Sequence, residues 1–260
     1  MRSQKVEFTN HNGYKLSARL ELPIDSHPVA YAIFAHVFTG NKSLSATRHI
    51  SRALSLSGIG VLRFDFTGLG QSEGDFANGS LSIWRDEVVE LIAAQISGDR
   101  VIVIGSSMGG WLMLLVGLAL GEKLAGLVGI APAPDFSDWG FDDAQKAHLR
   151  SGKTIFEESE YGYDPMPTHA KFWHDAERLR LLDTAIAINC PVRLLHGQED
   201  VVVPPDISLR LAAALASDDV QITLSKGGDH RLSRPADIAL LLNTLSALTT
   251  SEKPVSSETK

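Results

Sequence analysis

From Pro28 onward, short and continuously apolar segments alternate with longer segments of helical periodicity. The segments expected to be strands are Val29–Ala35, Gly60–Phe66, Arg100–Ile104, Leu124–Ile130, Val192–Leu195 and Val220–Leu224. The segments expected to be helices are Ser43–Ser57, Leu81–Ile96, Gly109–Leu120, Pro205–Ala216 and Pro235–Leu248. Strands that are apolar along their whole length are buried on both faces, as in a parallel sheet covered by helices on each side. The alternation therefore predicts an α/β fold with a doubly wound, mostly parallel sheet.

The residues before Pro28 follow a different pattern. Val6–Phe8 and Leu16–Leu22 alternate apolar and polar residues on either side of Asn12-Gly13, a dipeptide typical of tight hairpin turns. Such alternation is typical of strands with one buried face, which pair antiparallel when a short turn joins them. We therefore expect an antiparallel start to the sheet.

A second departure is the stretch from Pro134 to Asn189, which is polar, charged and rich in large aromatic side chains. It carries no strand signal, and its more than fifty residues are too many for a plain connecting loop. We interpret residues 135–189 as a small helical cap inserted into an α/β core made of residues 1–134 and 190–250. The tail, residues 251–260, is expected to be disordered.

Composition narrows the possible partners and compartments. A net charge of −7, with no cluster of basic residues, argues against nucleic acid as a partner. The single cysteine, Cys190, excludes an internal disulfide and a cysteine-cluster metal site. Residues 1–13 lack the apolar core of a signal peptide, and the longest apolar run, Met108–Leu120, is shorter than the roughly 18 residues that cross a bilayer. We expect a cytoplasmic protein without a membrane partner, whose oligomeric state the sequence leaves open.

The pattern Gly-x-Ser-x-Gly occurs twice, around Ser72 and around Ser107. In serine hydrolases the pattern must form a sharp turn between a strand and a helix, so that the hydroxyl stands above the edge of the sheet. Ser107 follows an apolar strand and precedes an apolar helix, whereas Ser72 lies in a glycine-rich stretch with no helix directly after it. Ser107 is therefore the predicted nucleophile, and Ser72 is expected in a surface turn.

A serine hydroxyl becomes an effective nucleophile when an imidazole accepts its proton. Of the nine histidines, His230 follows Gly227-Gly228 in the loop between the last predicted strand and the last predicted helix. The glycines allow this loop to approach the nucleophile closely. The order serine, acid, histidine along the chain is also the one expected for this type of elbow. We predict His230 as the general base.

A carboxylate is needed to hold the imidazole in the correct tautomer and to stabilise the imidazolium. Asp200 follows the strand Val192–Leu195 at the carboxyl edge of the predicted sheet and lies between Ser107 and His230 in the sequence. It is the predicted acid. Glu199 and Asp135 are the alternatives, and Asp135 is the better placed of the two because it follows another strand end.

The oxyanion of the reaction needs two hydrogen-bond donors. The backbone amides of Met108, directly after the nucleophile, and of Phe38, in the loop after the strand Val29–Ala35, are the predicted donors. His36 and His196 are expected to have structural roles. No local pair of metal ligands is present, so neither a metal nor any other cofactor is predicted.

Three motifs carry a family resemblance: Asp65–Ser72, Gly105–Trp111 and His196–Asp200. Together they resemble the α/β-hydrolase superfamily over nearly the whole chain. From about Gly58 to Thr249 the chain resembles the mitochondrial palmitoyl-protein thioesterases of that superfamily, which also cleave acyl glucuronides. The earlier part is more similar to bacterial hydrolase modules found fused to peroxide-reducing domains. The resemblance implies hydrolysis of an ester or a thioester by a serine nucleophile.

These residues predict a serine hydrolase that cleaves small-molecule carboxylic esters or thioesters through an acyl-enzyme. Trp139, Phe141 and Trp173 are the candidates for substrate contact, although aromatic side chains of a cap also form its own core. Peptidases, carbon–carbon hydrolases and perhydrolases use the same three catalytic residues. A catalytically silent binding protein on the same fold is the alternative from a different class.

Overall fold

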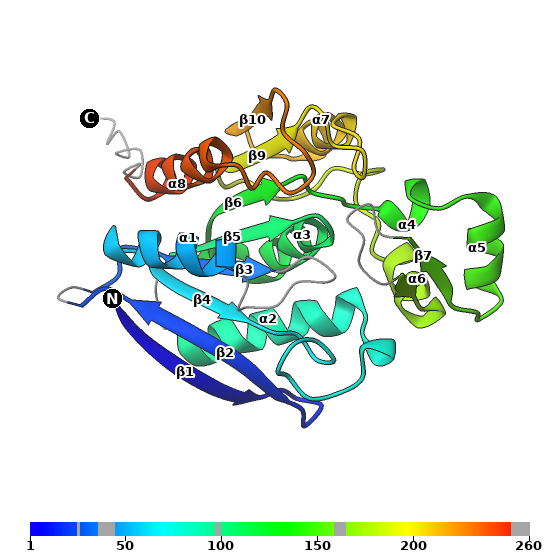
Figure 1. Cartoon of the computed structure of the whole chain (residues 1–260), viewed down its shortest axis with the longest axis horizontal. Coiled ribbons are helices and arrows are strands. Elements are labelled where there is room, and N and C mark those ends of the chain that lie inside the picture. The colour runs from blue at the N-terminus through cyan, green and yellow to red at the C-terminus, as the bar shows by residue number, and fades with distance from the viewer. Residues whose placement is uncertain (25–26, 36–44, 97–99, 159–164, 251–260) are drawn as a thin grey trace, which may run out of the picture.

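The computed structural model describes residues 1–24, 27–35, 45–96, 100–158 and 165–250. Its centre is an eight-stranded sheet in the order β1-β2-β4-β3-β5-β6-β9-β10 (Figure 1). The strands are β1 (Arg2–Thr9), β2 (Lys15–Leu22), β3 (Tyr31–Ala35), β4 (Gly60–Phe64), β5 (Val101–Ser106), β6 (Leu124–Ile130), β9 (Val192–Gly197) and β10 (Val220–Ser225). β2 is antiparallel to β1 and to β4, and all pairs from β4 to β10 are parallel. The predicted α/β fold and its antiparallel start are confirmed.

The hairpin between β1 and β2 forms where the Asn-Gly dipeptide predicts it. Thr9 pairs with Lys15, and the amide of Asn10 donates to the carbonyl of Tyr14 at 3.0 Å. Gly13 takes a φ of +83°, a left-handed conformation that glycine adopts without steric cost. The local turn chemistry therefore sets the register of the first two strands.

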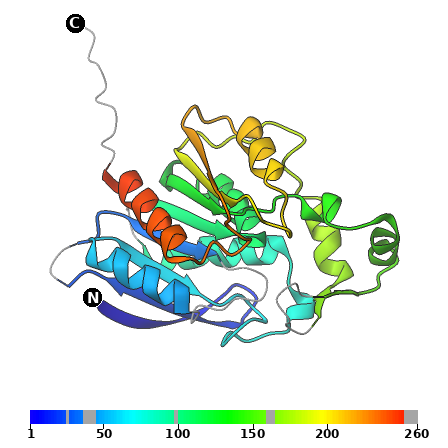
Figure 2. The same cartoon turned by 45° about the horizontal axis from the view of Figure 1, so that its top comes forward.

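Helices cover both faces of the sheet. They are α1 (Ser45–Leu56), α2 (Leu81–Gln95), α3 (Met108–Leu120), α7 (Asp206–Ala214) and α8 (Pro235–Thr250), with short 3₁₀ turns η1 (Phe76–Asn78) and η2 (Gly121–Lys123). α1 and α8 lie side by side on one face (Figure 2), and α2, α3 and α7 pack on the other. The predicted strands and helices are present, and the ends that can be compared differ by at most two residues, except that β1 begins at Arg2, four residues before the predicted Val6. The predicted start of the first helix, Ser43, lies outside the described residues.

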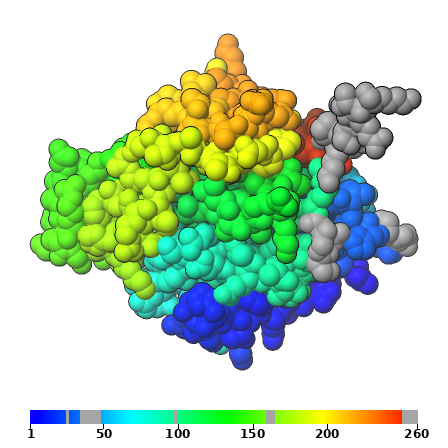
Figure 3. All heavy atoms as spheres, turned by 180° about the vertical axis from the view of Figure 1, so that it is seen from behind, coloured from blue at the N-terminus to red at the C-terminus, as the bar shows by residue number. Residues whose placement is uncertain are grey.

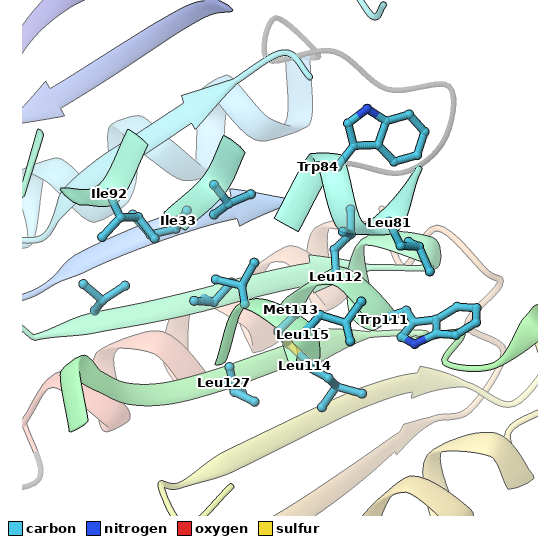
Figure 4. Close-up of a cluster of buried hydrophobic side chains, with 14 of the residues drawn as sticks. Ile33, Leu81, Trp84, Ile92, Trp111, Leu112, Met113, Leu114, Leu115 and Leu127 are labelled. Carbon is cyan, nitrogen blue, oxygen red and sulfur yellow. The ribbon is translucent and has the colours of Figure 1, made fainter. Parts of the chain in front are cut away.

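The larger of the two cores lies between the sheet and the helices α2 and α3 (Figure 4). Trp84 of α2 and Trp111 of α3 are fully buried there, and every residue of α3 from Met108 to Gly117 is buried. Burying one large apolar side chain contributes about 1.5–3 kcal/mol, so α3 is firmly fixed against the sheet. The long apolar run is thus a core helix, as predicted. None of the helices in the described residues is long and apolar enough to cross a membrane.

The segment between β6 and β9 projects from one side of the molecule (Figure 3, green and yellow-green). It contains α4 (Phe136–Trp139), α5 (Asp143–Arg150), β7 (Ile155–Glu157), β8 (Met166–Thr168) and α6 (Ala170–Glu177). The prediction that this segment has no strands is wrong, because β7 and β8 form a two-stranded antiparallel sheet. Each strand has only three residues, too few for a periodic strand signal in the sequence. We refer to residues 135–189 as the cap segment.

Polar contacts fix the cap segment to the rest of the fold. The carboxylate of Asp175 in α6 accepts hydrogen bonds from the amide and the hydroxyl of Ser82, at the start of α2, both at 2.8 Å. The indole N–H of Trp111 donates to the carbonyl of Leu179 at 3.1 Å. These bonds place the cap segment on the same side as the carboxyl ends of the parallel strands, where ligands bind in sheets of this kind.

Candidate active site

Ser107 forms a sharp turn between β5 and α3. Its φ and ψ are 55° and −124°, a strained conformation for a residue with a side chain. The turn is held by hydrogen bonds from the Ser107 amide to the carbonyl of Ile130 and from the Ala133 amide to the carbonyl of Ser107, each at 3.0 Å. A Cβ atom at Gly105 would lie 2.1 Å from the carbonyl oxygen of Gly109, so the turn tolerates only glycine at that position. The geometry is that of a nucleophile elbow.

The structure brings the three residues predicted for catalysis into contact. The Oγ atom of Ser107 lies 3.0 Å from Nε2 of His230. Nδ1 of His230 lies 2.8 Å from Oδ2 of Asp200. Ser107 and His230 are separated by 123 residues in the sequence, yet their side chains lie within proton-transfer distance.

The carboxylate of Asp200 is fully buried and held by several donors. Its Oδ1 atom accepts the amides of Val202 and Val203, both at 2.9 Å, and its Oδ2 atom lies 3.2 Å from Nε2 of His196. Burial by itself would raise the pKa of Asp200, but the hydrogen bonds from His196, His230 and Val203 outweigh it and hold the pKa well below its ordinary value. Asp200 is therefore an anion facing His230. The two valine amides could not be predicted from the sequence, because the loop conformation that presents them has no local signature.

Asp135, the better placed of the alternative carboxylates, has other contacts. Asp135 accepts the amides of Leu181 and Leu182 at distances of 2.7–3.0 Å, and so ties the start of α4 to the end of the cap segment. Burial raises the pKa of Asp135, and the hydrogen bonds from Leu182 and Leu181 oppose that rise. The carboxylate that contacts the imidazole of His230 is that of Asp200.

Ser72, in the second Gly-x-Ser-x-Gly match, lies in a turn that follows β4. Its hydroxyl donates to the carbonyl of Asp65 at 2.5 Å and accepts the amide of Ser17 at 2.9 Å. Both contacts link the turn to β2 and to the end of β4. This side chain therefore has a structural role within the turn, as the lack of a following helix predicts.

Met108 is the first residue of α3, so its amide has no acceptor within the helix. The amide points out of the helix amino terminus, where the helix dipole favours negative charge. The second predicted donor, Phe38, and the neighbouring His36 lie outside the described residues.

The three aromatic residues named as substrate contacts occupy different environments. Phe141 and Trp173 are 6% and 4% exposed and pack with Leu149 and Ile155 in the core of the cap segment. The indole N–H of Trp173 donates to the carbonyl of Ser137 at 3.0 Å, which fixes the ring inside that core. For these two residues the geometry agrees with the cap-core interpretation. Trp139 is half-buried and donates its N–H to the carbonyl of Pro134 at 2.8 Å.

Titratable side chains elsewhere in the described residues form no group of three or more that could hold a metal ion. The arrangement around Ser107 combines a serine in a strained backbone conformation, an imidazole and a buried anion. Chemically, such a group can transfer the serine proton and form a covalent acyl intermediate.

Comparisons with known proteins place the chain among the α/β-hydrolases. A family model described as serine aminopeptidase, S33, matches residues 28–183. The mitochondrial palmitoyl-protein thioesterase ABHD10 of mouse is 36% identical over 199 residues, which cover 74% of this chain and 65% of that protein. This chain therefore spans just under two thirds of the length of that relative.

Comparison with solved structures also places the chain among the α/β-hydrolases. The structure of α/β-hydrolase domain-containing protein 10 from mouse matches with a TM-score of 0.83 and 31% identity, over 94% of this chain and 98% of that one. The esterase domain of a Rhodothermus marinus protein matches with a TM-score of 0.71 and 30% identity, over 95% and 97% of the two chains. The predicted resemblance is confirmed.

The predicted cytoplasmic location is wrong by the same comparison, because the matching curated relatives from mouse, orangutan and human are mitochondrial proteins. The prediction rested on the lack of an apolar signal-peptide core. Mitochondrial targeting segments are amphipathic and rich in arginine rather than apolar, so that observation does not favour the cytoplasm over the mitochondrion.

Proposed function

Because the chain belongs to the α/β-hydrolase family, we propose that it is a serine hydrolase of the carboxylesterase or thioesterase type, which cleaves small-molecule esters or thioesters through an acyl-enzyme. The observation that carries the proposal is the 3.0 Å contact between Ser107 Oγ and His230 Nε2 at a residue whose φ is 55°. A serine in an ordinary turn requires neither the strained backbone nor the imidazole.

In the proposed mechanism, Ser107 Oγ attacks the carbonyl carbon of the substrate while His230 Nε2 accepts the hydroxyl proton. His230 Nδ1–H donates to the ionised Asp200, which stabilises the imidazolium that forms. The amide of Met108 and the amino terminus of α3 stabilise the oxyanion of the tetrahedral intermediate. The intermediate collapses, and the leaving alcohol or thiol takes the proton from His230. A water molecule then gives a proton to His230 and attacks the acyl carbon. The bond between that carbon and Ser107 Oγ breaks, His230 returns the proton to Oγ, and the acid is released.

The substrate class is proposed from two relatives. One of them is named as a palmitoyl-protein thioesterase and another as an esterase domain. Both names describe acyl transfer from oxygen or sulfur to water, which the proposed mechanism performs in the same way for either leaving group. In this proposal residues 1–134 and 190–250 form the catalytic core, and the cap segment forms one wall of the acyl site.

A fluorophosphonate probe tests the nucleophile. We expect the probe to form one covalent adduct on Ser107, found by peptide mass spectrometry, and no adduct in Ser107→Ala. Ser72→Ala is the matched control, since it removes the serine of the other Gly-x-Ser-x-Gly match, and it should label as the wild type does. A folded wild-type protein that takes up no probe would refute the proposal and favour a silent binding protein.

Peptidase activity is the second candidate, because the matching family model is described as serine aminopeptidase. A panel of p-nitrophenyl esters and S-acyl thioesters of increasing chain length, run beside aminoacyl p-nitroanilides, separates the two. We expect kcat/KM to be higher for the esters and thioesters. Faster cleavage of the anilides would replace the esterase proposal with the peptidase one.

A further inference from the structure

His196 is a second imidazole that contacts the same carboxylate as His230. It lies at the carboxyl end of β9, has no exposed surface, and its Nε2 atom lies 3.2 Å from Oδ2 of Asp200. The same Nε2 atom lies 2.9 Å from the carbonyl oxygen of Val203, and Nδ1 lies 2.7 Å from the hydroxyl of Ser208 in α7. Two imidazoles therefore flank one buried aspartate.

The partners of His196 determine which ring nitrogen carries the proton. A carbonyl oxygen only accepts hydrogen bonds, so Nε2 must donate to Val203. In a neutral ring Nδ1 then holds a lone pair, which accepts the hydroxyl hydrogen of Ser208. The Val203 carbonyl thus selects the tautomer whose Nε2–H lies between that carbonyl and Asp200, and Ser208 donates to the Nδ1 lone pair that this tautomer presents.

Hydrogen bonds to His196 and Asp200 hold Val203 in the loop after β9. Val203 donates its amide to Oδ1 of Asp200 and accepts Nε2–H of His196 through its carbonyl. Oδ2 of Asp200 then faces His230 at 2.8 Å. Because the side chain of Asp200 has no exposed surface, water cannot replace a lost donor without a rearrangement of the loop. The orientation of Asp200 toward His230 depends on protein donors alone.

We propose that His196 is a positioning residue for the reaction, which acts through Asp200, and that the hydrogen bond from Ser208 holds the His196 ring in the orientation that this role requires. The inference rests on the proposed serine-hydrolase function. Loss of His196 removes a donor from Oδ2 of Asp200 and releases the Val203 carbonyl, so the loop that presents the Val202 and Val203 amides to Oδ1 can shift. Asp200 then faces Nδ1 of His230 less often, and His230 is less often oriented to take the Ser107 proton. The acyl site itself is unchanged, so the effect falls on kcat and not on KM.

Three variants test the role. His196→Leu removes both ring nitrogens, His196→Gln keeps an amide N–H in reach of the Nε2 position, and Ser208→Ala removes the donor to Nδ1. Because a hydrogen bond to an ionised carboxylate is stronger than one between neutral groups, we expect His196→Leu to lower kcat about 10- to 100-fold, with KM within about twofold of the wild type. We expect His196→Gln to recover kcat to within about fivefold of the wild type, and Ser208→Ala to lower it about three- to tenfold.

A control separates positioning from stability. Leu194 lies two residues earlier on β9, is fully buried and belongs to the core between the sheet and the helices α2 and α3. Leu194→Ala should lower Tm at least as much as His196→Leu does and leave kcat unchanged. If His196→Leu is too unstable to purify, Ser208→Ala and His196→Gln still carry the test, because both retain most of the local packing.

The outcomes distinguish this inference from the proposed function. Wild-type kcat in folded His196→Leu and Ser208→Ala, with the wild type labelled at Ser107, overturns the role of His196 and leaves the serine hydrolase intact. A kcat loss in His196→Leu that His196→Gln does not restore also overturns it, because the donor is then irrelevant. A wild type that neither labels nor hydrolyses any ester overturns both.

Discussion

The chain contains the same five-residue pattern in two places, and the two copies have opposite surroundings. Around Ser107 the pattern joins β5 to α3, its backbone is strained at a φ of 55°, and the hydroxyl lies 3.0 Å from an imidazole. Around Ser72 the pattern is a turn, and the hydroxyl is engaged by the backbone of Asp65 and Ser17. The elements that flank a short motif, and not its letters, decide whether its serine can react.

Asp200, which faces the imidazole beside Ser107, and Glu87, which holds Thr67 ahead of the Ser72 motif, are both buried carboxylates, and their pKa values shift in opposite directions. Burial would raise the pKa of Asp200, but donors from His196, His230 and Val203 lower it overall. Burial also raises the pKa of Glu87, and the hydrogen bonds from Thr67 and Asn10 only partly oppose it. Asp200 is thus organised to remain an anion, whereas Glu87 accepts hydrogen bonds from Thr67, between β4 and the Ser72 motif, and from Asn10 in the hairpin turn.

The largest effect is expected for Ser107→Ala. Removal of the nucleophile from a group that acts as a unit typically lowers kcat by about a factor of 10⁶. Initial rates of p-nitrophenyl ester hydrolysis at saturating substrate measure the loss, and Ser72→Ala provides the comparison. Comparable losses in both variants would abolish the distinction between the two copies.

His230→Ala should lower turnover by at least about a thousandfold, because the serine proton then has no positioned acceptor. The same ester assay measures it, with unfolding monitored in parallel to confirm that the variant is folded. Near-normal turnover would mean that another base accepts the Ser107 proton and that the contact between Ser107 and His230 is not catalytic.

Much of the fold followed from local patterns. The bounds of β6, Leu124–Ile130, and the position of the Asn-Gly turn were predicted correctly, because strand burial and turn chemistry are encoded in neighbouring residues. β7 and β8 were missed, because three residues cannot show a period. Asp200 was selected by its place after a strand, since all parallel strands end at one edge.

Other features depend on contacts that no local pattern encodes. The approach of His196 to Asp200 arises from the loop that Val203 closes, and only the folded loop shows it. The burial of Phe141 and Trp173 in the core of the cap segment depends on how α5, α6 and the small sheet pack. An aromatic-rich sequence fits both a core and a binding wall, so composition alone leaves the two interpretations open.

Ser72→Ala should reduce stability and leave catalysis unchanged. It removes the hydroxyl that donates to Asp65 and leaves the amide of Ser17 without that acceptor, which costs about 1–2 kcal/mol for two partly buried hydrogen bonds. Urea denaturation followed by circular dichroism measures the change. A loss of ester hydrolysis in a stably folded Ser72→Ala protein would give this serine a role that its contacts do not support.

The smallest effect concerns how stability depends on pH. The folded pKa of Glu87 is raised, so the folded state binds this proton more tightly than the unfolded state does. The free energy of unfolding therefore falls as pH rises from the ordinary carboxyl range through the raised pKa. Glu87→Gln removes this dependence. The free energy of unfolding of the variant relative to that of the wild type, measured by urea denaturation from pH 5 to pH 8, should therefore increase with pH.

Asp200→Asn is the contrasting variant for that measurement. The folded pKa of Asp200 is lowered, so the stability contributed by its charge is complete above the unfolded pKa of about 3.9 and is lost only as pH falls below it. The stability difference between wild type and Asp200→Asn should therefore stay constant over the range in which that of Glu87→Gln changes. If the stability difference from the wild type changed equally with pH for both variants, the pKa values of Asp200 and Glu87 would not shift in opposite directions. The two regions would then differ in geometry but not in electrostatics.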